Sequence, residues 1–89
     1  MDPAAAQTLA LKALAWAAGD GDLLGDFLNV SGIEPPELRR RAADPELLAA
    51  FLDFLLAADK PVQAFCAEEG IRPDMLHAAR RALPGAAPE

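Results

Sequence analysis

Glycine and proline divide this chain into segments that are each long enough for only one short helix. The 89 residues include eight prolines and six glycines, and most of these lie at the borders of segments rich in alanine and leucine. Tyrosine is absent and β-branched residues are few, so helix propensity is high wherever glycine and proline do not intervene. The sequence therefore predicts an all-α, compact, single-domain bundle of five or six short helices.

Capping signals place the borders of these helices. Asp2-Pro3 and Asp44-Pro45 combine an N-cap acid with a first-turn proline, and Gly19, Gly32 and Gly70 offer stops. We expect helices near 3–18, 21–30, 35–43, from 45 through Leu56, 59–69 and 73–83. The domain would then span residues 1–83, and residues 84–89 would form a frayed tail.

Large apolar side chains are scarce. Hydrophobic residues make up 53% of the chain, but 21 of them are alanine. A chain this short buries only about 60 to 65% of its unfolded surface, so its stability should be a few kcal/mol. Leu9, Ala13 and Trp16 would form the inward face of the first helix, and the leucine-rich fourth helix would be the central pillar. The expected core consists of Trp16, Phe27, Phe51, Leu52, Leu55 and Phe65.

A five-residue pattern occurs twice, 38 positions apart. The two copies are Phe27, Gly32, Ile33, Pro35 and Leu38, then Phe65, Gly70, Ile71, Pro73 and Leu76. Each copy has a phenylalanine near a helix end, a glycine suited to a left-handed cap, and a proline that starts the next helix. The pattern predicts two helix-corner-helix units, which either duplication or shared physics could produce.

Several of these residues also occur in a known family. The segment 24–28 (Leu-Gly-Asp-Phe-Leu), the Gly32-Ile33 corner, Asp44-Pro45 followed by two leucines, the segment 52–55 and Phe65 resemble a family of short uncharacterised proteobacterial all-helical proteins, catalogued only as a domain of unknown function. The likeness spans about residues 9–83, and Lys60 departs from it, because the family has an acidic residue there. It implies a stand-alone cytoplasmic helical protein and no activity, ligand or catalytic residue.

The charge balance disfavours two classes of partner. The net charge is −6, which repels nucleic acid and anionic membranes at long range. The longest apolar run, 47–58, is far shorter than the roughly 20 residues that span a bilayer, and the first six residues lack a signal-peptide leader. A single cysteine forms no internal disulfide. We expect a cytoplasmic protein without a membrane segment.

The chain has little that could catalyse a reaction. It offers one histidine, one cysteine and two hydroxyl side chains, Thr8 and Ser31. Cys66 lies on an apolar helix stripe and His77 points away from one, which indicates a structural thiol and a solvated imidazole. The segment 20–31 resembles a calcium loop but lacks two ligands, so Asp20 is better explained as a helix cap. We predict that the protein is not an enzyme and has no cofactor or metal.

The second corner, residues 64–82, is similar to a helix-turn-helix. In such a corner a small residue, three further positions, a glycine and then an apolar residue let two helices cross closely. DNA contacts would then come from Arg72, His77, Arg80 and Arg81. Any tight corner in a bundle produces the same pattern, and the acids of this unit would face the DNA. The DNA-binding interpretation is therefore the alternative.

Three consecutive arginines, Arg39, Arg40 and Arg41, form the other concentrated charge. Consecutive helical positions lie about 100° apart, so the three cannot share one face. We expect them to pair with nearby acids such as Glu37, Asp44 and Glu46, although arginine also anchors protein interfaces. The leading hypothesis is a small non-enzymatic interaction or regulatory module that binds another protein, with a monomer favoured over a homodimer.

Overall fold

The structure, a computed structural model, describes residues 1–84 and has only helices as regular elements within that range. The elements are α1 (Pro3–Ala18), α2 (Gly21–Ser31), α3 (Pro35–Arg40), α4 (Pro45–Leu56), α5 (Asp59–Glu69) and α6 (Pro73–Ala82). The predicted all-α class is confirmed. Apart from Pro84, the predicted frayed tail lies outside the described residues.

Helix borders follow the capping signals. The carboxylates of three N-cap residues, Asp2, Asp20 and Asp44, accept hydrogen bonds from backbone N–H groups of the first helical turns. One border was wrong: α3 ends at Arg40 and not near Ala43. The chain instead turns over residues 41–43, where the backbone N–H of Asp44 donates to the carbonyl of Arg41 at 2.8 Å, before Asp44-Pro45 starts the next helix.

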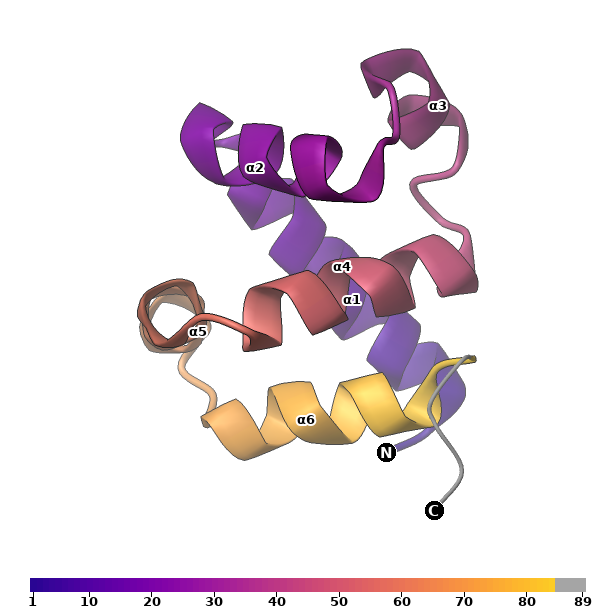
Figure 1. Ribbon diagram of the computed structural model, residues 1–89. Coiled ribbons are helices and arrows are strands. Elements are labelled where there is room, and N and C mark those ends of the chain that lie inside the picture. Colours follow the sequence, from indigo (N-terminus) through magenta and orange to yellow (C-terminus); the bar gives the residue numbers. More distant parts are fainter. Residues whose placement is uncertain (85–89) are drawn as a thin grey trace.

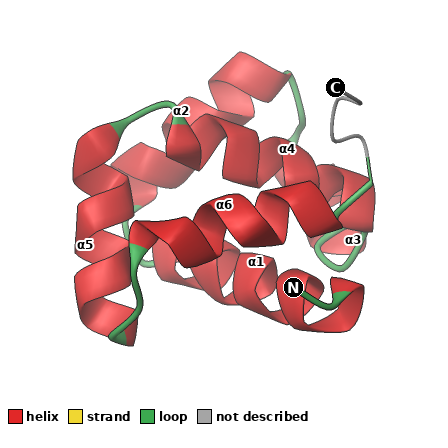
Figure 2. Ribbon diagram, turned by 90° about the horizontal axis from the view of Figure 1, so that it is seen from below, coloured by secondary structure: helices red, strands yellow, loops and turns green. Residues whose placement is uncertain are grey.

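The helices form two groups around α1. In Figure 1, α1 runs diagonally behind α4 and α6, while α2 and α3 lie at its upper end. Figure 2 shows α6 crossing α1, with α5 standing across one end of the bundle. Helix α1 packs against α2, α4 and α6, and α4 also packs against α5 and α6. Both α1 and α4 are therefore central, whereas α4 alone was expected to be.

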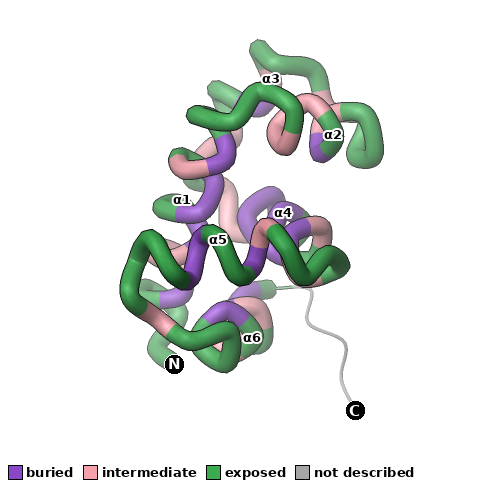
Figure 3. Tube along the Cα trace, turned by 90° about the vertical axis from the view of Figure 1, so that its left-hand side faces the viewer, coloured by how far each residue is buried: buried purple, intermediate pink, exposed green. Residues whose placement is uncertain are grey.

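The inward face of α1 consists mostly of alanine. Its buried residues are Ala6, Ala10, Ala13, Leu14 and Ala17. Figure 3 shows this buried stripe along α1. Leu9 and Trp16, which were expected to lead this face, are only half-buried. Small side chains let neighbouring helices approach α1 closely, because the distance between helix axes depends on the side chains at the contact.

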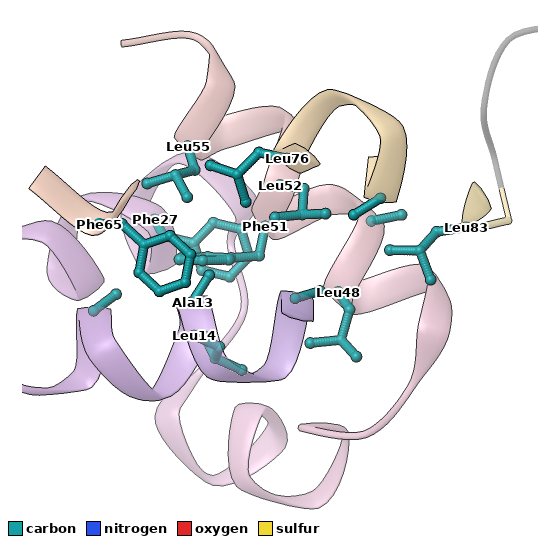
Figure 4. Close-up of a cluster of buried hydrophobic side chains, with 14 of the residues drawn as sticks. Ala13, Leu14, Phe27, Leu48, Phe51, Leu52, Leu55, Phe65, Leu76 and Leu83 are labelled. Carbon is teal, nitrogen blue, oxygen red and sulfur yellow. The ribbon is translucent and has the colours of Figure 1, made fainter. Parts of the chain in front are cut away.

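Larger side chains from α4 fill the space beside this stripe. Six residues of α4 are buried: Leu47, Leu48, Ala49, Phe51, Leu52 and Leu55. The rings of Phe51 and Phe27 meet edge to face with their centroids 5.1 Å apart, and Figure 4 shows both rings in the core cluster. Trp16 packs on Phe65 at 5.5 Å from the edge of this core. The predicted aromatic and leucine core is confirmed, with Trp16 at its margin.

The repeated pattern forms two matching corners. Gly32 and Gly70 have φ angles of +74° and +69°, in the left-handed region. Each glycine N–H donates to the carbonyl four residues earlier, on Leu28 and Cys66 respectively. Leu38 and Leu76, the last residues of the two copies, are both buried. The helix-corner-helix prediction is therefore confirmed for both copies.

These corners predict opposite effects for two glycine substitutions. Gly70→Ala places a Cβ in open space but at a positive φ, so we expect a loss of about 1–2 kcal/mol in the free energy of unfolding. Gly25→Ala, inside α2 and equally uncrowded, should gain about 0.5–1 kcal/mol. Urea unfolding followed by circular dichroism measures both changes. Equal signs for the two variants would contradict the assigned corner.

Candidate functional site

The chain's single thiol is buried, and its single imidazole is exposed. Cys66 is buried, and burial raises the pKa of its thiol because the thiolate would lose hydration. His77 is exposed on α6, as its position on the helix predicted. No group of three metal-ligating side chains occurs within residues 1–84. That the protein is not an enzyme stays a prediction.

Arg41 is held by the acids that were expected to pair with the arginine run. Its Nε and Nη2 donate to Asp44 Oδ2 at 3.2 and 3.1 Å, and its Nη1 donates to Glu37 Oε2 at 3.0 Å. Glu46 takes no part in this cluster; its backbone N–H is bound by Asp44 instead. Arg39 and Arg40 are exposed in the last turn of α3. The three arginines thus have different surroundings.

Arg80 lies in an ion pair between two helices. Its Nε and Nη2 donate to the two carboxylate oxygens of Asp53 on α4, at 2.6 and 3.0 Å. The Arg80 side chain is only 16% exposed. A two-point arginine–carboxylate contact of this kind fixes the geometry of both groups. Arg80 thus joins α6 to α4, while the other predicted DNA contacts, Arg72, His77 and Arg81, are exposed.

A groove runs between α1 on one side and α2 and α3 on the other. Its α1 wall consists of Leu11, Leu14, Ala15 and Ala18. These positions share one helix face, because residues three, four and seven apart lie above one another. Leu11 is 41% exposed, which makes it one of four large hydrophobic side chains exposed within residues 1–84. On this face, Leu11, Ala15 and Ala18 form an apolar surface that is open to solvent.

The opposite wall comes from Leu24 of α2 and from the α3 segment, which contributes Leu38, Arg39 and Ala42. The groove has a volume of about 290 Å³, and Arg39 is its only charged lining residue. Within residues 1–84, Arg39 has no hydrogen bond or ion pair through its side chain. The groove is thus apolar: Arg39 lines it with the carbon atoms of its side chain, and the guanidinium group, which has no partner within residues 1–84, lies outside the lining surface.

The wall formed by the α3 segment is tied to α1. The side chain of Gln7 donates a hydrogen bond of 2.8 Å from Nε2 to the carbonyl of Ala43, in the turn after α3. Buried Leu38 anchors α3 on the other side of that turn. The hydrogen bond ties the segment that carries Arg39 to α1. The groove is therefore a built feature of the packing.

Two other hollows are chemically mixed. One, beside Trp16 between α2 and α5, is lined by charges of both signs, including Asp26 and Lys60. The other lies at the start of α1 and includes the ion pair between Lys12 and Glu69, at 3.9 Å. In both, opposite charges of the protein itself are already present. The groove beside Arg39 differs because its charge is of one sign.

Sequence analysis did not single out this groove. Arg39 was named as a candidate contact, but Leu11 was not, although its spacing from Ala15 and Ala18 already placed the three on one face. The missing information was tertiary. Nothing in the local pattern shows which helices pack against α1, or that α2 and the α3 segment leave a groove open beside Leu11.

Comparison with known proteins adds a family but no activity. No curated protein and no solved structure matches the chain. No helix in the described part of the chain is long and apolar enough to cross a membrane. A family model described as "Protein of unknown function (DUF3572)" matches residues 3–86. The match confirms the resemblance inferred from the sequence and extends it at both ends. The chain belongs to this family of unknown function.

Proposed function

We propose that this protein is a small non-enzymatic interaction module that binds another protein through the groove between α1, α2 and α3. The observation that supports this proposal most strongly is the composition of the groove, whose lining is apolar except for Arg39. A hydrophobic groove is one of the recurring surfaces on which proteins bind a segment of another protein.

Two further features fit this function. Leu11 is a large apolar side chain that is exposed on α1, whereas four of the five buried residues of this helix are alanines. Exposing an apolar side chain beside a groove contributes nothing to folding, but it offers surface that a partner can bury. A cytoplasmic location is part of the proposal, because the single thiol is reduced and buried and requires no oxidising compartment.

The proposal is tested by capturing partners with matched bait variants. The wild-type chain, Leu11→Glu and Met75→Glu are immobilised and exposed to a lysate of the source cells. Leu11 and Met75 are almost equally exposed, at 41% and 38%, but Met75 lies outside the groove. We expect a protein that is retained by the wild type and by Met75→Glu and is at least tenfold depleted on Leu11→Glu. Circular dichroism checks that all three baits are folded.

An equal set of captured proteins on all three baits would contradict the proposal. The helix-turn-helix alternative is examined with the same proteins, by fluorescence anisotropy of a labelled random DNA duplex at low and moderate salt. Because phosphate contacts make DNA binding steeply salt-dependent, a DNA-binding protein would show micromolar affinity that falls as salt rises. Such binding, lost in Arg81→Glu, would replace the interaction module with a DNA-binding regulator.

A further inference from the structure

We infer that the occupant of the groove is an amphipathic α-helix of a partner protein, which inserts apolar side chains between α1 and α3 and places an aspartate or glutamate against Arg39. This inference rests on the proposed function and specifies the chemistry of the partner.

The apolar part of the occupant follows from the lining. Leu11, Ala15 and Ala18 are exposed on one face of α1, and Leu24 lies across from them. A polar side chain inserted here would lose water without gaining a hydrogen bond, which is costly. An apolar side chain would instead remove apolar surface from water on both partners. The small Ala15 and Ala18 also let the backbone of an incoming helix come close.

The helical form of the occupant follows from the backbone around the groove. All the elements that border it are helices, whose N–H and C=O groups bond within the helix. An extended peptide gains affinity by adding to an exposed strand edge, and residues 1–84 contain no strand. A helix satisfies its own backbone hydrogen bonds and presents side chains at a spacing that suits a groove.

The carboxylate follows from the charges. Lys12, Arg41 and Arg80 already pair with acids of this chain. Arg39 borders the groove with the carbon atoms of its side chain, and its guanidinium group, beyond the apolar lining, has no acidic partner within residues 1–84. The guanidinium group matches a carboxylate through two parallel hydrogen bonds. An aspartate or glutamate next to the apolar side chains of the partner helix would therefore form an ion pair with Arg39.

The net charge of −6 does not oppose this contact at close range. At physiological ionic strength the Debye length is about 8 Å, so exposed acids elsewhere on the surface are largely screened. A second copy of this chain would have to fill the groove with a protruding apolar side chain of its own, for which the most exposed candidate is Val30 at 76%.

The test is a selection from phage-displayed, alanine-based helices whose one face is randomised among apolar and charged residues, with the intact chain as target. We expect enriched clones to carry apolar residues at three- and four-residue spacing next to a glutamate or aspartate. An enriched peptide is then synthesised together with a copy in which that acid is replaced by lysine. Fluorescence anisotropy measures the affinity of both peptides for the wild type, Leu11→Glu, Arg39→Glu and Met75→Glu.

We expect Leu11→Glu to weaken the acidic peptide at least tenfold, and Met75→Glu to leave its affinity unchanged. Arg39→Glu should weaken the acidic peptide about fivefold to tenfold, as expected when a surface ion pair of up to about 1 kcal/mol is replaced by repulsion. The decisive result is a charge swap: the lysine copy should bind Arg39→Glu more tightly than the acidic peptide does.

Other outcomes distinguish this inference from the proposed function. Enriched peptides that need Leu11 but carry no acid, or that are indifferent to Arg39→Glu, would overturn the acidic helix and leave the groove as the docking site. Failure to recover any peptide that depends on Leu11 would overturn the helix as occupant, and the capture experiment would then decide the proposed function by itself. Sedimentation that shows a dimer lost in both Leu11→Glu and Val30→Glu would replace the partner helix with a second copy.

Discussion

Phe51→Ala is expected to leave the chain largely unfolded at 25 °C. Phe51 is fully buried at the centre of α4, with its ring edge to face against Phe27. Truncating a buried phenylalanine costs about 3–5 kcal/mol, because the transfer energy of the ring is lost and a cavity remains. A domain of this size has a total stability of only a few kcal/mol. The measurement is urea and thermal unfolding followed by circular dichroism.

Phe54→Ala provides the matched control. Phe54 is in the same helix, and its ring contacts the rings of Phe27 and Phe51, but it is only half-buried. We expect it to cost clearly less and to retain a cooperative transition. If Phe51→Ala melted within a few degrees of the wild type, the placement of Phe51 at the centre of the core would be wrong.

The second large effect is expected from enlarging a side chain. Ala13 is fully buried in α1, and Figure 4 shows it pointing into the cluster that contains Phe51 and Phe65. Ala13→Leu adds three carbon atoms where other helices already pack, and overpacking of this kind costs about 1–3 kcal/mol or occasionally more. For a domain of this size, about 4–8 °C of midpoint temperature is lost per kcal/mol. We therefore expect a drop of about 4–24 °C.

The control for this prediction lies on the same helix. Ala4 is exposed near the start of α1, and Ala4→Leu adds the same atoms without meeting the core. Its midpoint should stay close to that of the wild type, since leucine is nearly as good a helix former as alanine. Equal effects of Ala4→Leu and Ala13→Leu would contradict an alanine face packed against other helices.

Much of the fold could be predicted because its borders are locally encoded. Asp44-Pro45, Gly32 and Gly70 act within one turn of their own positions, through caps and left-handed backbone. The repeated corner was also visible as a spacing in the sequence. The early end of α3 could not be predicted in this way, because the proline at position 45 restricts only Asp44 and leaves residues 41–43 free to continue the helix.

The packing faces were harder to predict, for a physical reason. Local hydrophobicity favoured Leu9 and Trp16 as the inward residues of α1, because large side chains gain more from burial. The structure instead buries the alanines of α1, because the large buried side chains of α4 fill the space beside them. Leu11, on another face of α1, stays outside the core and borders the groove. Arg39 could be listed as a candidate, but its apolar surroundings come from three helices.

Methyl NMR spectra of the intact chain, titrated with the selected acidic peptide, show whether the peptide binds in this groove. We expect the methyl signals of Leu11, Leu24 and Leu38, which line the groove, to shift as the peptide is added. The methyl signals of Met75 and Ile71, in the hollow at the start of α1, should stay in place. Shifts confined to Met75 and Ile71, with the groove signals unchanged, would contradict the account.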